Sequence, residues 1–116
     1  MVPMITIVEL PEYIRTSEKL MDAEERENVI NHIARNPRAG VLIKGTGGIR
    51  KMRWARKGMG KSSGARIIYF YYNESIPIFM LTAFGKNEKT NLTKAERNDL
   101  AKLTTLLVKS YKRGNK

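Results

Sequence analysis

The chain of 116 residues contains no cysteine and a single histidine. Without cysteine there is no disulfide framework and no thiolate metal site, and one histidine cannot form an imidazole cluster. We therefore expect no disulfide, no metal ion and no other cofactor. Long hydrophobic runs are also missing, because the longest, residues 76–83, is far below the roughly 20 residues that a membrane-spanning helix needs. Residues 1–13 have no basic leader, so we expect a cytoplasmic protein without membrane association.

Acidic residues are absent from the middle of the chain. Between Asn28 and Asn73 there is no Asp or Glu, whereas ten Lys and Arg residues stand there. This segment accounts for most of the net charge of +11. Such a cationic region is typical of proteins that bind a polyanion, because each cation that meets a phosphate releases condensed counterions. Nucleic acid is therefore the leading candidate partner.

Hydrophobic periodicity and capping signals predict one domain, residues 1–116, of the α+β class. The expected elements are a strand over 4–10, helix over most of 17–35, a strand over 49–56, a hairpin of strands over 65–72 and 76–83, and a helix from Thr93 onward. Asp22 with Glu25, and Thr93 with Glu96, have the spacing of capping boxes. In the last helix we expect a buried stripe of Leu100, Leu103, Leu106 and Leu107. The predicted fold is a small antiparallel sheet with the helices packed on one face.

Residues 55–62, ARKGMGKS, fit the loose pattern of a phosphate-binding loop in nucleotidases. A true loop of that kind places its Lys and Ser at the start of a helix, where the backbone amides hold the phosphates. Here Ser62 is followed by Ser63, Gly64 and a β-rich run, and no acid for magnesium is nearby. We therefore favour a flexible cationic hairpin loop over a nucleotidase.

The stronger cluster of functional residues is Lys51, Arg53 and Arg66, with Lys57 and Lys61 in the loop between their strands. Residues two apart on a strand share a face, so Lys51 and Arg53 can reach one phosphodiester, and a hairpin would bring Arg66 near them. A solvated sheet face whose charges oppose aggregation is the alternative. Crowded cations repel one another, however, which favours a site where an anion lies between them.

Aromatic residues and the lone histidine are weighed separately. His32 lies in the acid-rich helix, and we assign it no catalytic role. Trp54 shares its strand face with Met52 and is expected to belong to the core. Tyr72 has two open interpretations, since it could stack on a base or complete the core.

The strings GTGGIRKMRWAR (residues 45–56) and LTAFGKNEKTNLTKAERNDLAKL (residues 81–103), and the arginine that opens ARIIYFYY (residues 65–72), resemble the RelE and HigB toxins of bacterial toxin–antitoxin modules. The resemblance spans nearly the whole chain and is strongest to the HigB-like branch. It implies the RelE-like microbial ribonuclease fold. It also implies metal-independent cleavage of mRNA in the ribosomal A site of the 30S subunit, and inhibition by a cognate antitoxin, HigA-like with a helix-turn-helix DNA-binding domain.

Carried over to this chain, three of the family's catalytic cations fall on Lys51, Arg53 and Arg66. The family's cation after the fourth strand would fall near residues 85–89, where Lys86 is our candidate catalytic residue. The chain departs from the RelE pattern at Asn87, where the family has an arginine, and at Thr93, where it has a tyrosine. Further candidates for binding RNA or the ribosome are Lys44, Arg50, Arg56, Lys57, Lys61, Tyr72 and Lys89. The resemblance thus predicts an mRNA interferase, an endoribonuclease that blocks translation.

The expected chemistry follows from the charge. Attack of a ribose 2′-hydroxyl on the adjacent phosphate builds negative charge that fixed cations stabilise. Arg66 suits the role of phosphate clamp, because a guanidinium binds two oxygens at once and keeps its proton. Lys51 is the first candidate for the general base and Lys86 the second. The rival interpretations are a non-catalytic RNA-binding or ribosome-associated protein and, third, a DNA-binding regulator.

Overall fold

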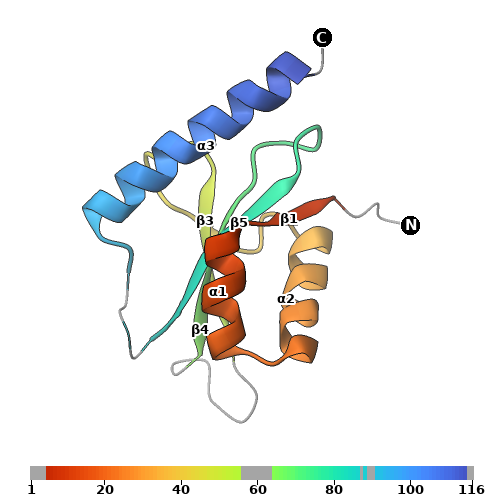
Figure 1. Ribbon diagram of the computed structural model, residues 1–116, viewed down its shortest axis with the longest axis vertical. Helices are drawn as coiled ribbons and strands as arrows, with labels where there is room; N and C mark the ends of the chain where they lie inside the picture. The colour runs from red at the N-terminus through yellow and green to blue at the C-terminus, as the bar shows by residue number, and fades with distance from the viewer. Residues whose placement is uncertain (1–4, 56–63, 87, 89–90, 115–116) are drawn as a thin grey trace.

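The computed structural model describes residues 5–55, 64–86, 88 and 91–114. Figure 1 shows a sheet with three helices. Helices α1 and α2 lie side by side, and α3 crosses the sheet apart from them. The elements in chain order are β1 (Ile7–Glu9), α1 (Pro11–Leu20), α2 (Ala23–Arg35), β2 (Val41–Leu42), β3 (Ile49–Trp54), β4 (Ala65–Phe70), β5 (Ile78–Gly85) and α3 (Lys94–Gly114). The α+β class expected from the sequence is confirmed.

The five strands form one sheet in the order β1-β5-β4-β3-β2. Neighbouring strands from β2 to β5 are antiparallel, but β1 pairs with β5 in parallel. The expectation of a purely antiparallel sheet is therefore wrong in this detail. The parallel pair arises because β1 joins β5 across a long connection that contains all the other strands, rather than through a hairpin.

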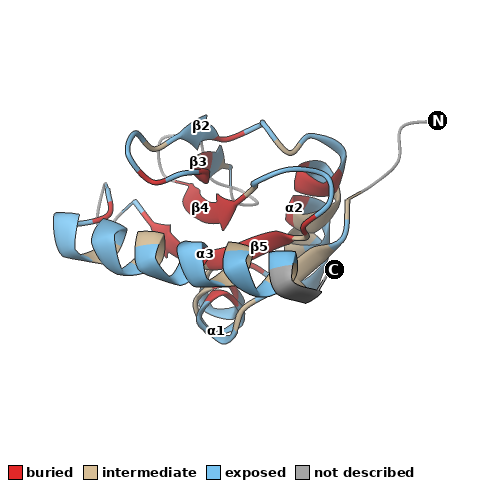
Figure 2. Ribbon diagram, turned by 90° about the horizontal axis from the view of Figure 1, so that it is seen from above, coloured by how far each residue is buried: buried red, intermediate tan, exposed pale blue. Residues whose placement is uncertain are grey.

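Helices cover both faces of the sheet, not one face as the sequence predicted. On one face Tyr13, Val29 and Ile33 from α1 and α2 share a core with Ile67 and Tyr69 of β4. On the other face the segment of α3 packs through a second core, which holds Leu92, Leu100, Leu107, Ile68 and Phe70. Every residue of β4 is buried (Figure 2). A strand that is apolar on both faces needs cover on both, and this requirement places α3 opposite α1 and α2.

The helix expected over residues 17–35 is two helices. The Asp22 side chain accepts a 2.8 Å hydrogen bond from the Glu25 amide, which confirms the predicted cap of α2. Upstream, α1 begins at Pro11. The sequence analysis used this proline to end the first strand, but a proline also suits the first turn of a helix, where its missing N–H has no partner to lose.

The capping box of α3 is confirmed: the Thr93 hydroxyl accepts from the Glu96 amide, and the Glu96 carboxylate accepts from the Thr93 amide. The predicted leucine stripe is wrong in part, because the Leu103 and Leu106 side chains are 37% and 64% exposed. Leu100 and Leu107 do pack on the sheet. A single helix laid on a sheet buries a narrow stripe, so leucines beside that stripe stay exposed. No described helix, α3 included, is long and apolar enough to span a bilayer.

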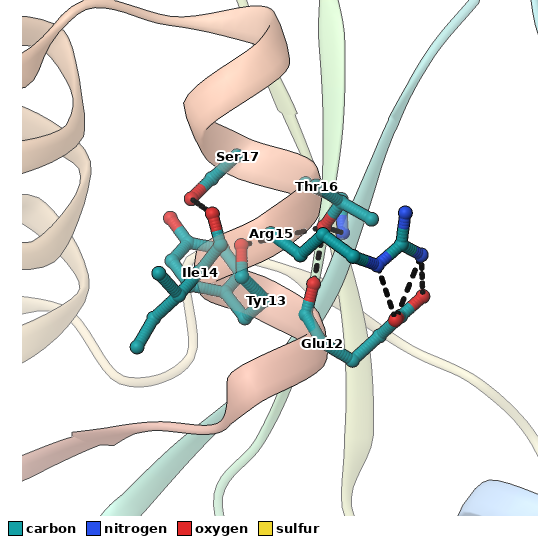
Figure 3. Close-up of polar contacts among 7 residues, drawn as sticks. Glu12, Tyr13, Ile14, Arg15, Thr16 and Ser17 are labelled. Carbon is teal, nitrogen blue, oxygen red and sulfur yellow. Dashed lines mark hydrogen bonds and ion pairs between the residues drawn. The ribbon is translucent and has the colours of Figure 1, made fainter.

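A side chain of α1 completes the hydrogen bonding of β5. Strand β1 pairs with Ile78–Met80 and ends there, so the edge of β5 beyond Met80 has no described strand beside it. At that edge the Thr16 hydroxyl accepts a 3.0 Å hydrogen bond from the Ala83 amide and donates to the Glu12 carbonyl at 2.9 Å (Figure 3). Thr16 therefore replaces the missing strand for one buried donor.

We expect Thr16→Val to lower the free energy of unfolding by about 1 to 3 kcal/mol, since the buried Ala83 amide then lacks an acceptor. Urea titration followed by circular dichroism measures this change. The matched control is Thr105→Val on α3, whose exposed hydroxyl bonds to a carbonyl of its own helix and should change stability by about 0.5 kcal/mol or less. Equal effects of the two substitutions would show that Thr16 has no special role.

Tyr13 generates a pH-dependent prediction. Burial raises the pKa of the Tyr13 hydroxyl from 10.0 to about 12, and the nearby Glu9 carboxylate adds to the shift. Because the pKa of the folded state lies above that of the unfolded state, the contribution to stability is complete below pH 10 and declines between pH 10 and pH 12. In urea titrations across this window, Tyr13→Phe should lose less stability than the wild type. Parallel declines would contradict the assignment.

Candidate active site

The register of β3 and β4 brings three predicted cations to one face of the sheet. Arg53 stands directly opposite Arg66, and Lys51 is paired with Ile68. Ile68 belongs to the core on the α3 side, so the cations that share its face also lie on that side of the sheet. We call Lys51, Arg53 and Arg66 the cationic cluster.

Arg66 is unusual within this cluster because it is almost completely buried. Its exposed fraction is 6%, and its Nη1 atom has no hydrogen-bond partner in the described part of the chain. Directly opposed like charges destabilise a sheet, and a buried donor without an acceptor costs about 1 to 3 kcal/mol of free energy. Both costs fall when an anion lies against the two arginines. The local electrostatics therefore favour binding of a phosphate.

Lys51 lines a hollow of about 440 Å³ where α3 begins. Its ammonium group donates a hydrogen bond to the Asn91 side-chain carbonyl, and Arg97 from the first turns of α3 lines the same hollow. Neither Asn91 nor Arg97 was singled out in the sequence. The capping box fixed where α3 starts, but the position of that start against β3 depends on which face α3 covers, and this was predicted incorrectly.

Lys86 lies close to the start of β4. Its side chain is exposed, and its amide donates a 3.3 Å hydrogen bond to the Gly64 carbonyl, two residues before Arg66. The structure thus brings the fourth predicted catalytic residue to the same end of β4 as Arg66. Thr93, where the resemblance predicts a tyrosine, uses its hydroxyl to cap α3.

The structure does not bring the other candidates together at this cluster. Arg50 is paired with Tyr69 in the register of the sheet, so it faces the α2 side, and its guanidinium donates a 2.8 Å hydrogen bond to the Gly40 carbonyl. Tyr72 follows the opposite end of β4, where the Lys112 ammonium lies 5.5 Å from its ring centroid. Lys44 is exposed in the turn before β3. The remaining candidates, Arg56, Lys57, Lys61 and Lys89, and residues 56–62 of the loop pattern ARKGMGKS, lie outside the described residues.

The cluster can stabilise charge but its arginines cannot move protons. A guanidinium stays protonated at any physiological pH, so Arg53 and Arg66 can hold phosphate oxygens and cannot act as a base. Within the described residues, no group of three His, Asp or Glu side chains could hold a metal ion. The chemistry supported by these groups is electrostatic stabilisation of an anion, with a lysine as the proton-transfer group.

We expect Arg66→Met to raise the free energy of unfolding of the ligand-free protein by about 1 to 4 kcal/mol, the range observed when buried ionic groups are replaced by well-packed apolar ones. The unbranched methionine fits the space of the arginine stem and removes both the buried charge and the repulsion from Arg53. Thermal and urea unfolding measure the change, with Arg15→Met as the control because Arg15 is exposed. A lower free energy of unfolding for Arg66→Met would contradict the view that Arg66 destabilises the ligand-free protein.

The sequence comparison agrees with this geometry. Residues 15–114 match the family model described as the RelE toxin of the RelE / RelB toxin-antitoxin system. The matched range includes the whole cationic cluster, the hollow beside Lys51 and all of α3. The match identifies the RelE family but does not distinguish the HigB-like branch that was expected from the sequence. The chain belongs to the RelE toxin family, the toxins of toxin–antitoxin systems.

Proposed function

We propose that this toxin is a HigB-like, ribosome-dependent endoribonuclease that cuts mRNA in the A site without a metal ion. Membership of the RelE family supports an endoribonuclease in general. The observation that carries the proposal is the buried Arg66 guanidinium, with its unpartnered Nη1 atom, opposite Arg53. A guanidinium with an unsatisfied donor in the empty protein can bind the negative charge that cleavage develops.

In the proposed reaction the ribose 2′-oxygen attacks the adjacent phosphorus and forms a 2′,3′-cyclic phosphate. The bond from phosphorus to the 5′-oxygen breaks, and another lysine or a ribosomal group protonates the leaving 5′-oxygen. Arg66 and Arg53 hold the non-bridging oxygens and stabilise the phosphorane more strongly than the ground state. Lys51 is our first choice for the base that removes the 2′-hydroxyl proton, because it shares the face of Arg53 and Arg66; only its neutral amine can accept that proton. Lys86 is the second, since it lies at the same end of β4.

Basic residues outside the cluster support docking on the ribosome. Arg35, Arg38, Lys44, Lys109 and Lys112 are all exposed and can meet ribosomal RNA phosphates. The partner that inhibits the toxin is an antitoxin, as its family implies. We propose that this antitoxin is HigA-like, carries a helix-turn-helix DNA-binding domain and covers the cationic face.

Expression in a bacterium, followed by primer extension on cellular transcripts, tests the proposal. The wild type should arrest growth and produce cuts in translated mRNA, whereas Arg66→Ala should reduce cleavage about 100- to 1000-fold, the usual loss when one stabilising donor is removed. Lys102→Ala serves as the control, because Lys102 is an exposed lysine of α3 outside the cluster. Undiminished cleavage by Arg66→Ala would contradict the assignment.

A non-catalytic RNA-binding protein remains the second candidate, supported by the same net charge of +11. Such a protein should lose affinity gradually as cations are removed, without a sharp loss of turnover at one position. A purified preparation that cuts naked transcript and ribosome-bound mRNA at equal rates would instead indicate an ordinary nuclease.

A further inference from the structure

The edge of β3 next to the cationic cluster opens into a hollow of about 770 Å³. We call it the edge groove, and its walls include His32, Val41, Lys51, Arg53 and Trp54. Lys51 and Arg53 belong to the cationic cluster as well, so the groove adjoins the proposed site of cleavage. It extends from that site toward α2, on the side of the sheet away from α3.

The groove exists because β2 is too short to cover β3. Val41, the first residue of β2, is paired with Lys51 of β3. Beyond that pair no described strand lies beside Met52–Trp54 on this edge of β3. The Ile43 amide donates to the Ile49 carbonyl, which shows that Ile49 turns its backbone groups toward β2. By the alternation of a strand, Arg53 turns its amide and carbonyl toward the same edge, beyond the end of β2. The groove therefore offers backbone hydrogen-bonding groups in addition to its side chains.

Two aromatic rings form one wall of the groove. The centroids of the Trp54 and His32 rings are 5.8 Å apart, and their planes are inclined at 58°. Trp54 is half-buried against the core, whereas the His32 side chain is exposed. Trp54 was expected to be a core residue, and the structure shows that it also lines an open surface. The neighbouring Val41 side chain is 75% exposed, which makes the wall largely apolar.

The charge of the groove identifies its occupant. All of its lining residues in the described part of the chain fall between His32 and Ala55, inside the segment from Asn28 to Asn73 that has no Asp or Glu. A groove that combines an aromatic wall with cations and contains no carboxylate matches the surfaces that bind single-stranded nucleic acid, where bases stack on rings and phosphates meet cations. A basic peptide would find no acidic partner there.

We propose that the edge groove is a nucleobase subsite, in which the mRNA nucleotide next to the scissile linkage stacks on Trp54 and His32. Arg53 and Trp54 are neighbours on a strand, so their side chains point to opposite faces of the sheet. RNA that crosses the open edge of β3 can thus leave its phosphate on Arg53 and Lys51 and place its base on Trp54. This inference rests on the proposed function, because it assumes that RNA occupies the cationic cluster.

Trp54 is the single tryptophan of the chain and reports directly on its own stacking. The wild-type protein is titrated with a 2′-O-methyl oligoribonucleotide, which cannot be cleaved, and tryptophan emission is recorded. We expect saturable quenching by this oligomer and little quenching by an abasic ribose–phosphate oligomer of equal length. Equal quenching by the two oligomers, or none by either, overturns the subsite.

Substitutions supply an independent measurement by fluorescence anisotropy of a dye-labelled oligomer. Trp54→Ala should weaken binding about 5- to 100-fold, as expected for the loss of one stacked base, and Trp54→Phe should recover part of the affinity. His32→Ala tests the second ring and avoids the core. Leu106→Ala is the control, since this exposed leucine lies on α3. Unchanged affinity in both Trp54→Phe and His32→Ala overturns the proposal, even if Trp54→Ala fails to fold.

Cleavage on programmed ribosomes separates the possible occupants. If the subsite holds an mRNA base, Trp54→Phe should change the preference for one nucleotide beside the cut. A uniform loss of cleavage at all cut sites would indicate that the groove binds a ribosomal RNA base, and it would overturn the mRNA assignment. Unchanged cleavage together with weakened antitoxin binding would indicate that a strand of the antitoxin occupies the edge of β3, and it would also overturn the mRNA assignment. Base-dependent quenching without any cleavage would refute the proposed nuclease activity but support the nucleobase subsite. Cleavage without base-dependent quenching would support the nuclease activity and refute the subsite.

Discussion

The opposition of Arg53 and Arg66 across two neighbouring strands is the constraint on which the rest of the structure depends. Arg66 is buried within a strand whose other members are apolar, and the Arg66 Nη1 atom has no partner in the described part of the chain. A sheet selected for stability alone would place an apolar or oppositely charged residue there. The protein therefore keeps a local arrangement that is unfavourable when empty, as is common where binding or catalysis sets the requirement.

The remainder of the fold holds this arrangement in place. Cores on both faces bury β4 along its whole length, and Arg66 itself is only 6% exposed. The start of α3 brings Asn91 and Arg97 to the side of Lys51, and the short β2 leaves the next part of β3 open. Rigid elements thus fix the cations, while the edge of the sheet gives access to a groove beside them. This division between a fixed site and an open edge suits a long, flexible substrate such as RNA.

Much of the fold could be predicted from the sequence because local signals agreed with the final packing. The alternation in residues 49–54 placed Lys51 and Arg53 on one face, and the capping boxes at Asp22 and Thr93 marked two helix starts. The convergence of Arg66 with Lys51 and Arg53 followed from the hairpin between their strands. Long-range facts were harder to obtain: the parallel partner of β1 and the face that α3 covers depend on packing between distant segments, which no local pattern encodes.

The same limit explains the errors at the site. Asn91 and Arg97 were missed because their position depends on the placement of α3. Trp54 does pack against the core as predicted, but its second position at an open edge was missed because strand alternation does not reveal where a neighbouring strand ends. Leu103 and Leu106 were counted as buried because helical spacing cannot tell how wide the contact with the sheet will be.

A double-mutant cycle on Arg53 and Arg66 tests the central claim most directly. The free energies of unfolding of the wild type, Arg53→Met, Arg66→Met and the double variant would be measured with and without a saturating, non-cleavable 2′-O-methyl oligoribonucleotide. Our account predicts that the two arginines destabilise each other in the empty protein and that this coupling energy changes sign when the oligomer binds. A coupling energy near zero, or one that is favourable in the empty protein and unaffected by the oligomer, would contradict it.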